Sequence, residues 1–157
     1  LGELELLEPV AEEGMKSGLK FAGFEGSWDA LPNFDELVPV VDGVVTMPAE
    51  DAFSSETGEN FGIRFEGFVK IPEEGLYTFY TSSDDGSRLS IGNDVVVNND
   101  GLHAVQRKSG LVRLTAGLHP VTILFFEQAG DEKLEISWEG PGLALELVPE
   151  AAWFHKP

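Results

Sequence analysis

Short segments in which apolar and polar residues alternate, separated by glycine-rich turns, constrain the fold of this chain most strongly. The clearest is the segment 61–71, in which alternate apolar residues fall on one side: Phe61, Ile63, Phe65, Val69 and Ile71. A period of two is typical of a strand with one buried face. The sequence Pro-Glu-Glu-Gly at 72–75 predicts a turn, and the aromatic and β-branched residues at 76–81 predict the returning strand.

The same pattern recurs along most of the chain. We expect further extended segments at residues 88–91, 95–97, 104–108, 110–114, 121–126 and 134–138. Residues 121–126 are apolar on both faces and therefore predict a central, buried strand. Before residue 61 we expect a strand at 19–24, a loop anchored by Trp28 and Phe34, and a loop or one helical turn at 51–60. The tail at 145–153 predicts an edge strand. Strands this short at this spacing predict an all-β sandwich or barrel.

Length and composition narrow the classes of function. The chain has 157 residues, of which 42% are hydrophobic, so residues 1–157 can form a single domain with a real core. The net charge is -18, from 28 acidic and 10 basic residues, and such a surface repels nucleic acid and anionic membranes. With no cysteine there is no disulfide or thiolate metal site, and no apolar run is long enough to span a membrane.

The most informative polar segment is Ser-Ser-Asp-Asp-Gly-Ser at 82–87. In a strand with trans peptide bonds, the side chains of adjacent residues point to opposite faces. Asp84 and Asp85 can therefore reach one ion only if the backbone bends sharply. A cis peptide bond between them would do this, and Gly86 supplies freedom beside it. Calcium would be the natural ligand because it takes six to eight oxygen atoms in irregular geometry, whereas magnesium demands an octahedron and zinc prefers nitrogen or sulfur. The alternative is an ordinary turn, in which Asp and Gly are common.

A second loop, at residues 127–133, carries further oxygen donors between two predicted strands. Asp131 and Glu132 are candidates there, although solvated loop charges are the commoner case. His103 lies in a turn after Gly101 and is a candidate for ligand contact. We expect His119 to be a packing residue and His155 to be exposed.

Signals for catalysis are absent from the sequence. It contains no nucleophile elbow, phosphate loop or zinc-type histidine spacing, and no pair of its many acids is singled out for glycoside hydrolysis. We therefore expect a non-catalytic domain.

Four segments, in order, resemble the PA-fourteen domain, a module named for the anthrax protective antigen that also occurs in adhesins and secreted glycosidases. They are Phe-x-Gly-Phe-Val-x-Ile-Pro-x-x-Gly-Leu-Tyr-Thr-Phe at 65–79, Ser-Asp-Asp-Gly-Ser-x-Leu at 83–89, Gly-x-Val-x-Leu-x-Ala-Gly-x-His-Pro-Val at 110–121 and Leu-x-Ile-x-Trp at 134–138. Residues 24–34 resemble modules attached to bacterial β-hexosaminidases. The resemblance implies a two-sheet antiparallel β-sandwich.

In the carbohydrate-binding members, a cis Asp-Asp pair holds a calcium ion whose coordination is completed by sugar hydroxyls. The resemblance places Asp84 and Asp85 at that pair and residues 127–133 at the loop that adds an amide oxygen and main-chain carbonyls. The register is open by one residue: Gln128 offers an amide, and Glu127 stands where the adhesins carry Asn. The carbonyls then come from Ala129 and Asp131, or from Gly130 and Glu132. The expected sugar contacts are Asp84, Asp85, Gln128, Asp131 and His103.

The resemblance leaves two functional hypotheses. The first is a calcium-dependent, lectin-like domain within a larger secreted adhesin or carbohydrate-active enzyme, whose partners are a glycan and neighbouring domains of the same chain. The second is a structural domain without its own sugar ligand. Both imply an extracellular, cell-surface or periplasmic location.

Overall fold

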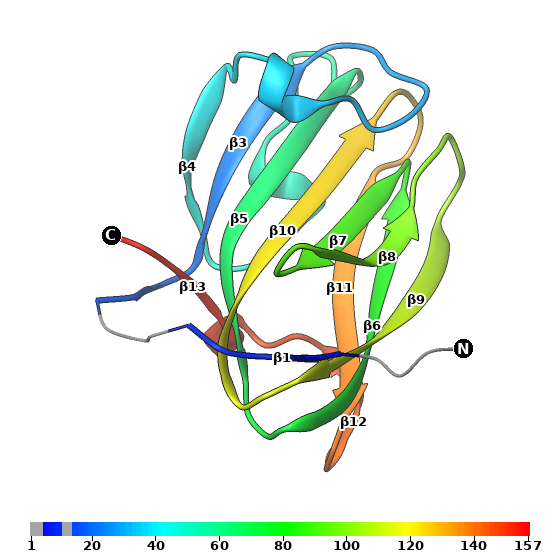
Figure 1. Ribbon diagram of the computed structural model, residues 1–157. Coiled ribbons are helices and arrows are strands. Elements are labelled where there is room, and N and C mark those ends of the chain that lie inside the picture. Colours follow the sequence, from blue (N-terminus) through cyan, green and yellow to red (C-terminus); the bar gives the residue numbers. More distant parts are fainter. Residues whose placement is uncertain (1–4, 11–13) are drawn as a thin grey trace.

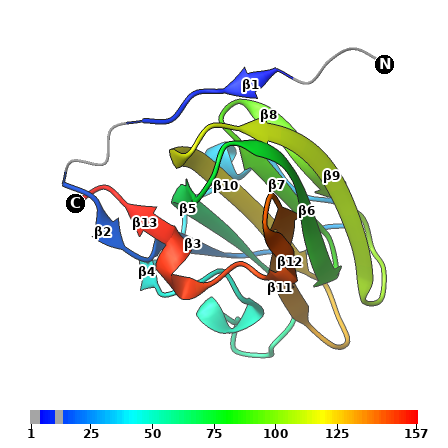
Figure 2. The same ribbon diagram turned by 90° about the horizontal axis from the view of Figure 1, so that it is seen from below.

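The computed structural model describes residues 5–10 and 14–157, which form two β-sheets packed face to face as a sandwich (Figures 1 and 2). The first sheet has the strand order β1-β9-β6-β11-β12, and all its pairs are antiparallel except β1 with β9. Its strands are β1 (Leu6–Leu7), β6 (Gly75–Asp84), β9 (Gln106–Leu114), β11 (Lys133–Gly140) and β12 (Leu143–Leu147).

The second sheet has the order β2-β13-β5-β10-β7-β8, with β3 paired to β5 and β4 paired to β3. Its strands are β2 (Lys16–Ser17), β3 (Leu19–Glu25), β4 (Val41–Val45), β5 (Phe61–Ile71), β7 (Ser87–Ile91), β8 (Asp94–Asn99), β10 (Gly117–Glu127) and β13 (Trp153–His155). Three single 3-10 turns complete the described elements: η1 (Phe34–Glu36), η2 (Glu50–Ala52) and η3 (Glu150–Ala152). None of these turns has the length or hydropathy to cross a membrane.

The core lies between the sheets and is built by the period-two pattern. In β5 the predicted face is buried, with Phe61, Ile63 and Phe65 each 0% exposed. The facing sheet contributes the aromatic cluster of Tyr77, Phe79 and Trp138, whose ring centroids are 6.0–6.3 Å apart. Each large apolar side chain buried in this way contributes about 1.5–3 kcal/mol to stability. The predicted all-β, two-sheet antiparallel sandwich is therefore confirmed.

The structure corrects several local expectations. The two segments expected at 104–108 and 110–114 form one strand, β9, which begins only at Gln106, and β4 has no counterpart among the expected strands. The tail divides between the layers: β12 forms the edge of one sheet, whereas β13 pairs with β5 and β2 in the other. The expectation that His155 is exposed is wrong. It is 7% exposed, with Nδ1 3.0 Å from the carbonyl of Gly18, because β13 lies inside its sheet.

Candidate functional site

The end of the sandwich that lies uppermost in Figure 1 gathers the polar segments singled out in the sequence. Strand β6 runs up to Asp84 and pairs there with the start of β11 at Lys133. Strand β10 ends beside them at Glu127, opposite Phe61 of β5. The turn after β6 and the loop after β10 therefore meet at one edge of the core.

Three carboxylates converge at this edge. The Asp84–Asp85 peptide bond is cis, as expected. Carboxylate oxygens of Asp84, Asp85 and Glu127 lie within 4.8 Å of one another, and the three residues are only 8%, 6% and 0% exposed. We call these three side chains the carboxylate cluster. It is a buried group of hard oxygen donors, which is the ligand chemistry of calcium.

Backbone amides hold Asp85 in place. The N–H of His103 donates to Asp85 Oδ1 (3.2 Å), and the N–H of Gln128 donates to Asp85 Oδ2 (2.8 Å). Asp85 thus ties the loop after β8 to the loop after β10. Because each oxygen accepts one of these bonds, each keeps lone-pair capacity that a cation can use.

Glu127 is the unusual member of the cluster. Both of its carboxylate oxygens are buried, and no described residue donates a hydrogen bond to either. Burial, followed by the neighbouring Asp85 and then the charges of Asp84 and Glu132, raises the pKa of Glu127 to about 9. A buried carboxylate in this position must carry a proton or face a cation, since an unpaired buried charge is very costly.

The electrostatics of Asp84 agree with this arrangement. Burial, and then the adjacent Asp85, raise the pKa of Asp84; Asp131 adds to the effect, and His103 opposes it. The negative charge of Asp131 therefore acts on the pKa of a carboxyl group in the cluster. Glu132 differs, because its pKa is raised by burial and then by Glu50, the residue that opens η2.

The two side chains between which the sequence left the register open point in different directions. Glu127 is the last residue of β10 and continues the inward face of Val121, Ile123 and Phe125. Gln128 is turned away: its Nε2 donates to Asp29 Oδ1 (2.8 Å) and to the carbonyl of Trp28 (3.3 Å). The structure thus brings Glu127 into the cluster, while the Gln128 side chain joins the loop after β3.

The remaining predicted residues surround the cluster. Ala129, Gly130, Asp131 and Glu132 are exposed in the loop between β10 and β11, and Gly130 has the positive φ of 91° that a tight turn uses. His103 meets the cluster through its backbone. Its ring nitrogens each lie 2.8 Å from a main-chain carbonyl, Nδ1 from Ala104 and Nε2 from Asn99.

A buried polar network beneath the Asp84–Asp85 turn was not anticipated from the sequence. Ser83 Oγ lies 2.7 Å from Ser87 Oγ, which in turn donates to Thr81 Oγ1 (3.1 Å). Asn99 Nδ2 donates to the carbonyl of Gln106 (2.8 Å). Hydroxyls inside a strand pattern, as at Ser83 and Ser87, are the only hint in the sequence. The network fixes both ends of the turn, because buried polar groups are stable only when paired.

Gly86 is required by the close approach of three neighbours. A Cβ at this position would lie 2.6 Å from Phe126 Cε1, 2.8 Å from the amide nitrogen of Gly101 and 3.0 Å from Asp100 Oδ1. Asp100 Oδ1 is itself fixed in position, because it accepts hydrogen bonds from the N–H groups of Leu31 (2.8 Å) and Gly101 (2.7 Å). The turn therefore has little room to move.

We predict that Gly86→Ala lowers the free energy of unfolding by about 1–3 kcal/mol, the usual range for overpacking a tight site. Urea unfolding of the metal-free protein measures this. An unchanged midpoint would contradict the packing described for Gly86.

Comparisons with known proteins were made for both sequence and structure. Residues 39–151 match the PA14 domain family. No curated protein sequence matches the chain. Among solved structures, an anti-sigma factor domain-containing protein is similar with a TM-score of 0.76 and 16% identity, over 90% of this chain and 49% of the other. This chain thus spans about half the length of that protein.

Two further solved structures are similar over nearly their whole length. One is the PA14 sugar-binding domain from an RTX adhesin, with a TM-score of 0.73 and 17% identity over 88% of this chain and 98% of the other. The other is the Epithelial Adhesin 9 A domain from Candida glabrata in complex with Galβ1-3GlcNAc, with a TM-score of 0.71 and 11% identity over 94% and 93%. At these identities the structural likeness shows the fold.

Proposed function

The chain belongs to the PA14 domain family, and from this premise we propose that it is a carbohydrate-binding domain whose ligand is held at a calcium ion. The ion's side-chain ligands are the carboxylates of Asp84, Asp85 and Glu127. The single observation that carries the proposal is the burial of these three carboxylates within 4.8 Å of one another, with no donor to either oxygen of Glu127 among residues 5–10 and 14–157. A divalent cation is the partner that satisfies all three at once.

The residues present fit calcium better than other common metals. The cluster offers oxygen alone, with no sulfur and no free imidazole nitrogen, which disfavours zinc and copper. The loop between β10 and β11 adds main-chain carbonyls at Ala129 and Asp131, or at Gly130 and Glu132. A bound calcium ion would supply open coordination positions for two hydroxyls of a sugar ring.

Similar solved structures support a binding role without catalysis for this domain. Solved structures of the same fold include a sugar-binding domain and an adhesin domain in complex with a glycan. By that likeness we assign residues 1–157 to one glycan-binding domain of a secreted or cell-surface protein, acting beside other domains of the same chain. Since few atoms of a single sugar contact the protein, we expect micromolar to millimolar affinity.

A glycan array probed with the labelled domain tests this function. We expect binding to at least one neutral glycan in millimolar calcium, and complete loss of that binding in excess EDTA, with recovery when calcium is restored. Binding that persists unchanged in EDTA would contradict the calcium-dependent mechanism. Calcium binding with no glycan retained at high protein concentration would instead favour a structural domain.

A further inference from the structure

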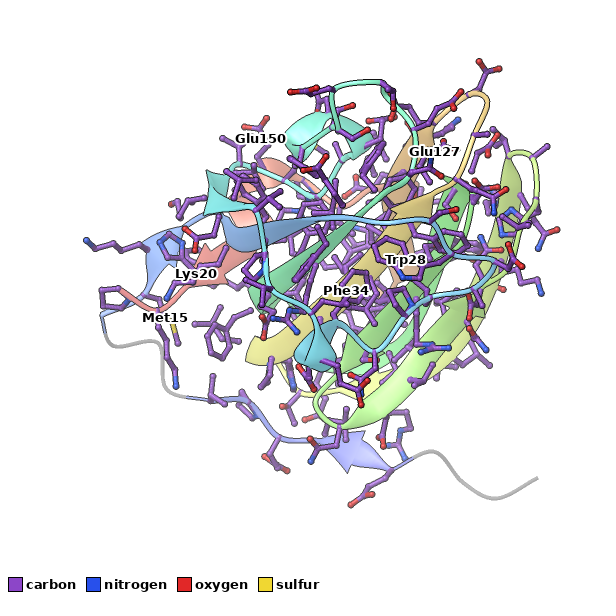
Figure 3. All side chains as sticks on the ribbon, turned by 90° about the horizontal axis from the view of Figure 1, so that it is seen from above. Met15, Lys20, Trp28, Phe34, Glu127 and Glu150 are labelled. Atoms are coloured by element: carbon purple, nitrogen blue, oxygen red, sulfur yellow. The ribbon has the colours of Figure 1, made fainter. Side chains whose placement is uncertain are left out.

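The outer face of the first sheet is open to solvent, whereas that of the second sheet is partly covered by the chain itself. On the second sheet, Phe34 lies so close to Gly62 of β5 that a Cβ there would be 2.9 Å from its Cε1 atom. Figure 3 shows Phe34 directed from its loop toward β5. The N–H of Val10 donates to the carbonyl of Leu118 in β10 (2.7 Å). On the first sheet, the outward side chains of β6 are all exposed or half-buried: Leu76, Thr78, Tyr80 and Ser82.

Apolar and aromatic side chains lie on this open face. Leu76, Leu111 and Leu147 are each about half exposed, on β6, β9 and β12. On β6, the ring of Tyr80 has the Arg107 guanidinium 4.9 Å from its centroid, and its hydroxyl donates to Glu139. Tyrosine and arginine are enriched where proteins contact each other, and side chains already held in place lose little entropy on binding. The composition therefore favours a protein partner.

Acidic side chains are scarce on this face, although the chain carries 28 of them. The outward positions of β9, β6 and β11 hold two acidic residues, Glu135 and Glu139, against three basic residues: Arg107, Arg113 and Lys133. A chain with a net charge of -18 repels a second copy of itself over most of its surface. The balance of charge on this face removes that repulsion locally.

The charges are arranged so that two copies of the face complement each other. Arg107 of β9 and Glu135 of β11 lie on opposite sides of Ser82 of β6, in one row across the three strands. A two-fold axis that runs parallel to β6, between two facing copies, exchanges these two sides. It therefore places Arg107 of each protomer opposite Glu135 of the partner subunit. Such reciprocal contacts are what a symmetric dimer interface requires.

Both side chains are available for these contacts. Arg107 forms no ion pair with a carboxylate in residues 5–10 and 14–157, and its guanidinium keeps N–H donors at its edge while it lies over Tyr80. Glu135 pairs with Lys133 (3.1 Å), but its side chain is 44% exposed and can accept from a second cation.

The size of the face indicates a weak dimer. Strands β9, β6, β11 and β12, about 4.8 Å apart and about eight residues long with a rise of about 3.4 Å, offer about 500 Å² per protomer. Two such faces bury about 1,000 Å² in total, which is the lower limit for a specific interface. We therefore expect a dissociation constant of about 0.1 mM.

We propose that this outer face is a dimer interface, on which a second copy of the domain packs about a two-fold axis parallel to β6. Strand β6 then runs in the same direction in both protomers and ends at Asp84, so the two carboxylate clusters lie at the same end of the dimer. Two sites at one end hold a glycan-covered surface more tightly than one site does. The dimer itself goes beyond the proposed function; only this consequence rests on it.

Sedimentation velocity at protein concentrations from about 1 µM to about 1 mM tests the dimer. Arg107→Glu and Glu135→Arg each put like charges at both contacts of a homodimer, and each should weaken dimerisation about tenfold or more. Mixed in equal amounts, the two variants put opposite charges at both contacts and should associate about as tightly as the parent protein. Lys20→Glu is the matched control, since it reverses the same charge on exposed Lys20 of β3 in the second sheet and should leave dimerisation unchanged (Figure 3).

Each result bears on a separate part of the inference. A parent protein that stays monomeric at about 1 mM, or two variants that dimerise as tightly as the parent, would overturn the interface. Weakening by both variants without recovery in their mixture would overturn the two-fold arrangement. Dimerisation should persist in excess EDTA, because the carboxylate cluster lies outside the interface. A domain that dimerises but binds neither calcium nor glycan overturns the proposed function alone, and a monomer that binds both overturns the dimer alone.

Discussion

Asp85→Asn is expected to lower the affinity for calcium by about two orders of magnitude or more, because even residues behind a metal's ligands are worth about 10–100-fold. Asp85 contributes a charge to the cluster and accepts from the amides of His103 and Gln128. Asparagine keeps one acceptor oxygen but loses the charge and turns an N–H₂ group toward one of these amides. The fold should lose only about 1 kcal/mol, the usual value of one hydrogen bond.

Calorimetric titration of the metal-free domain with calcium measures this effect. Asp42→Asn is the matched control, since it removes the same charge from exposed β4 and should leave the titration unchanged. Superimposable calcium isotherms for Asp85→Asn and the parent protein would reject Asp85 as a ligand. Loss of the cooperative unfolding transition in Asp85→Asn would show that Asp85 is required for folding rather than mainly for calcium binding.

The second large effect concerns pH. In the metal-free protein the pKa of Glu127 is raised to about 9, above its ordinary value of 4.5, so the folded state keeps a proton that the unfolded chain releases. The resulting stabilisation is fully present below pH 4.5 and is lost as the pH rises toward 9. Between these limits, one retained proton lowers the free energy of unfolding by up to about 1.4 kcal/mol for each pH unit.

Urea unfolding in excess EDTA at a series of pH values checks this slope. Glu127→Gln, which is neutral throughout, should flatten it and should make the metal-free protein more stable than the parent at pH 8. Calcium should also reverse the trend in the parent protein, because binding displaces the proton and becomes tighter as the pH rises. Equal slopes for the parent and Glu127→Gln would show that this carboxyl group titrates normally.

The fold could be predicted because its central strands follow one simple rule. The buried face of each strand carries alternate apolar residues: Phe61, Ile63, Phe65, Val69 and Ile71 in β5, and Val121, Ile123 and Phe125 in β10. The short outer strands obey no such rule. β2 is exposed, and β4 has Gly43 in its centre, so neither carries a clear alternation. Their pairing is decided by distant segments, and the same is true of β13, which buries His155 against expectation.

The candidate site was predictable in its centre and less so at its edges. The Asp84–Asp85 pair stands out in the sequence because two adjacent carboxylates repel each other unless a positive charge lies between them, and because Gly86 beside them allows a sharp bend. The inward direction of Glu127 could have been predicted by extending the alternation of Val121, Ile123 and Phe125 in β10 by one more step. The contacts of Gln128 with Asp29 and Trp28 could not have been predicted, because no local sequence pattern relates residues about 100 positions apart.

A crystal structure of the domain grown with calcium tests the central claim most directly. We expect one calcium ion at about 2.3–2.6 Å from carboxylate oxygens of Asp84, Asp85 and Glu127, the usual calcium–oxygen distance. A cluster without an ion at saturating calcium, with the Glu127 carboxyl group sharing a proton with Asp85, would contradict the account.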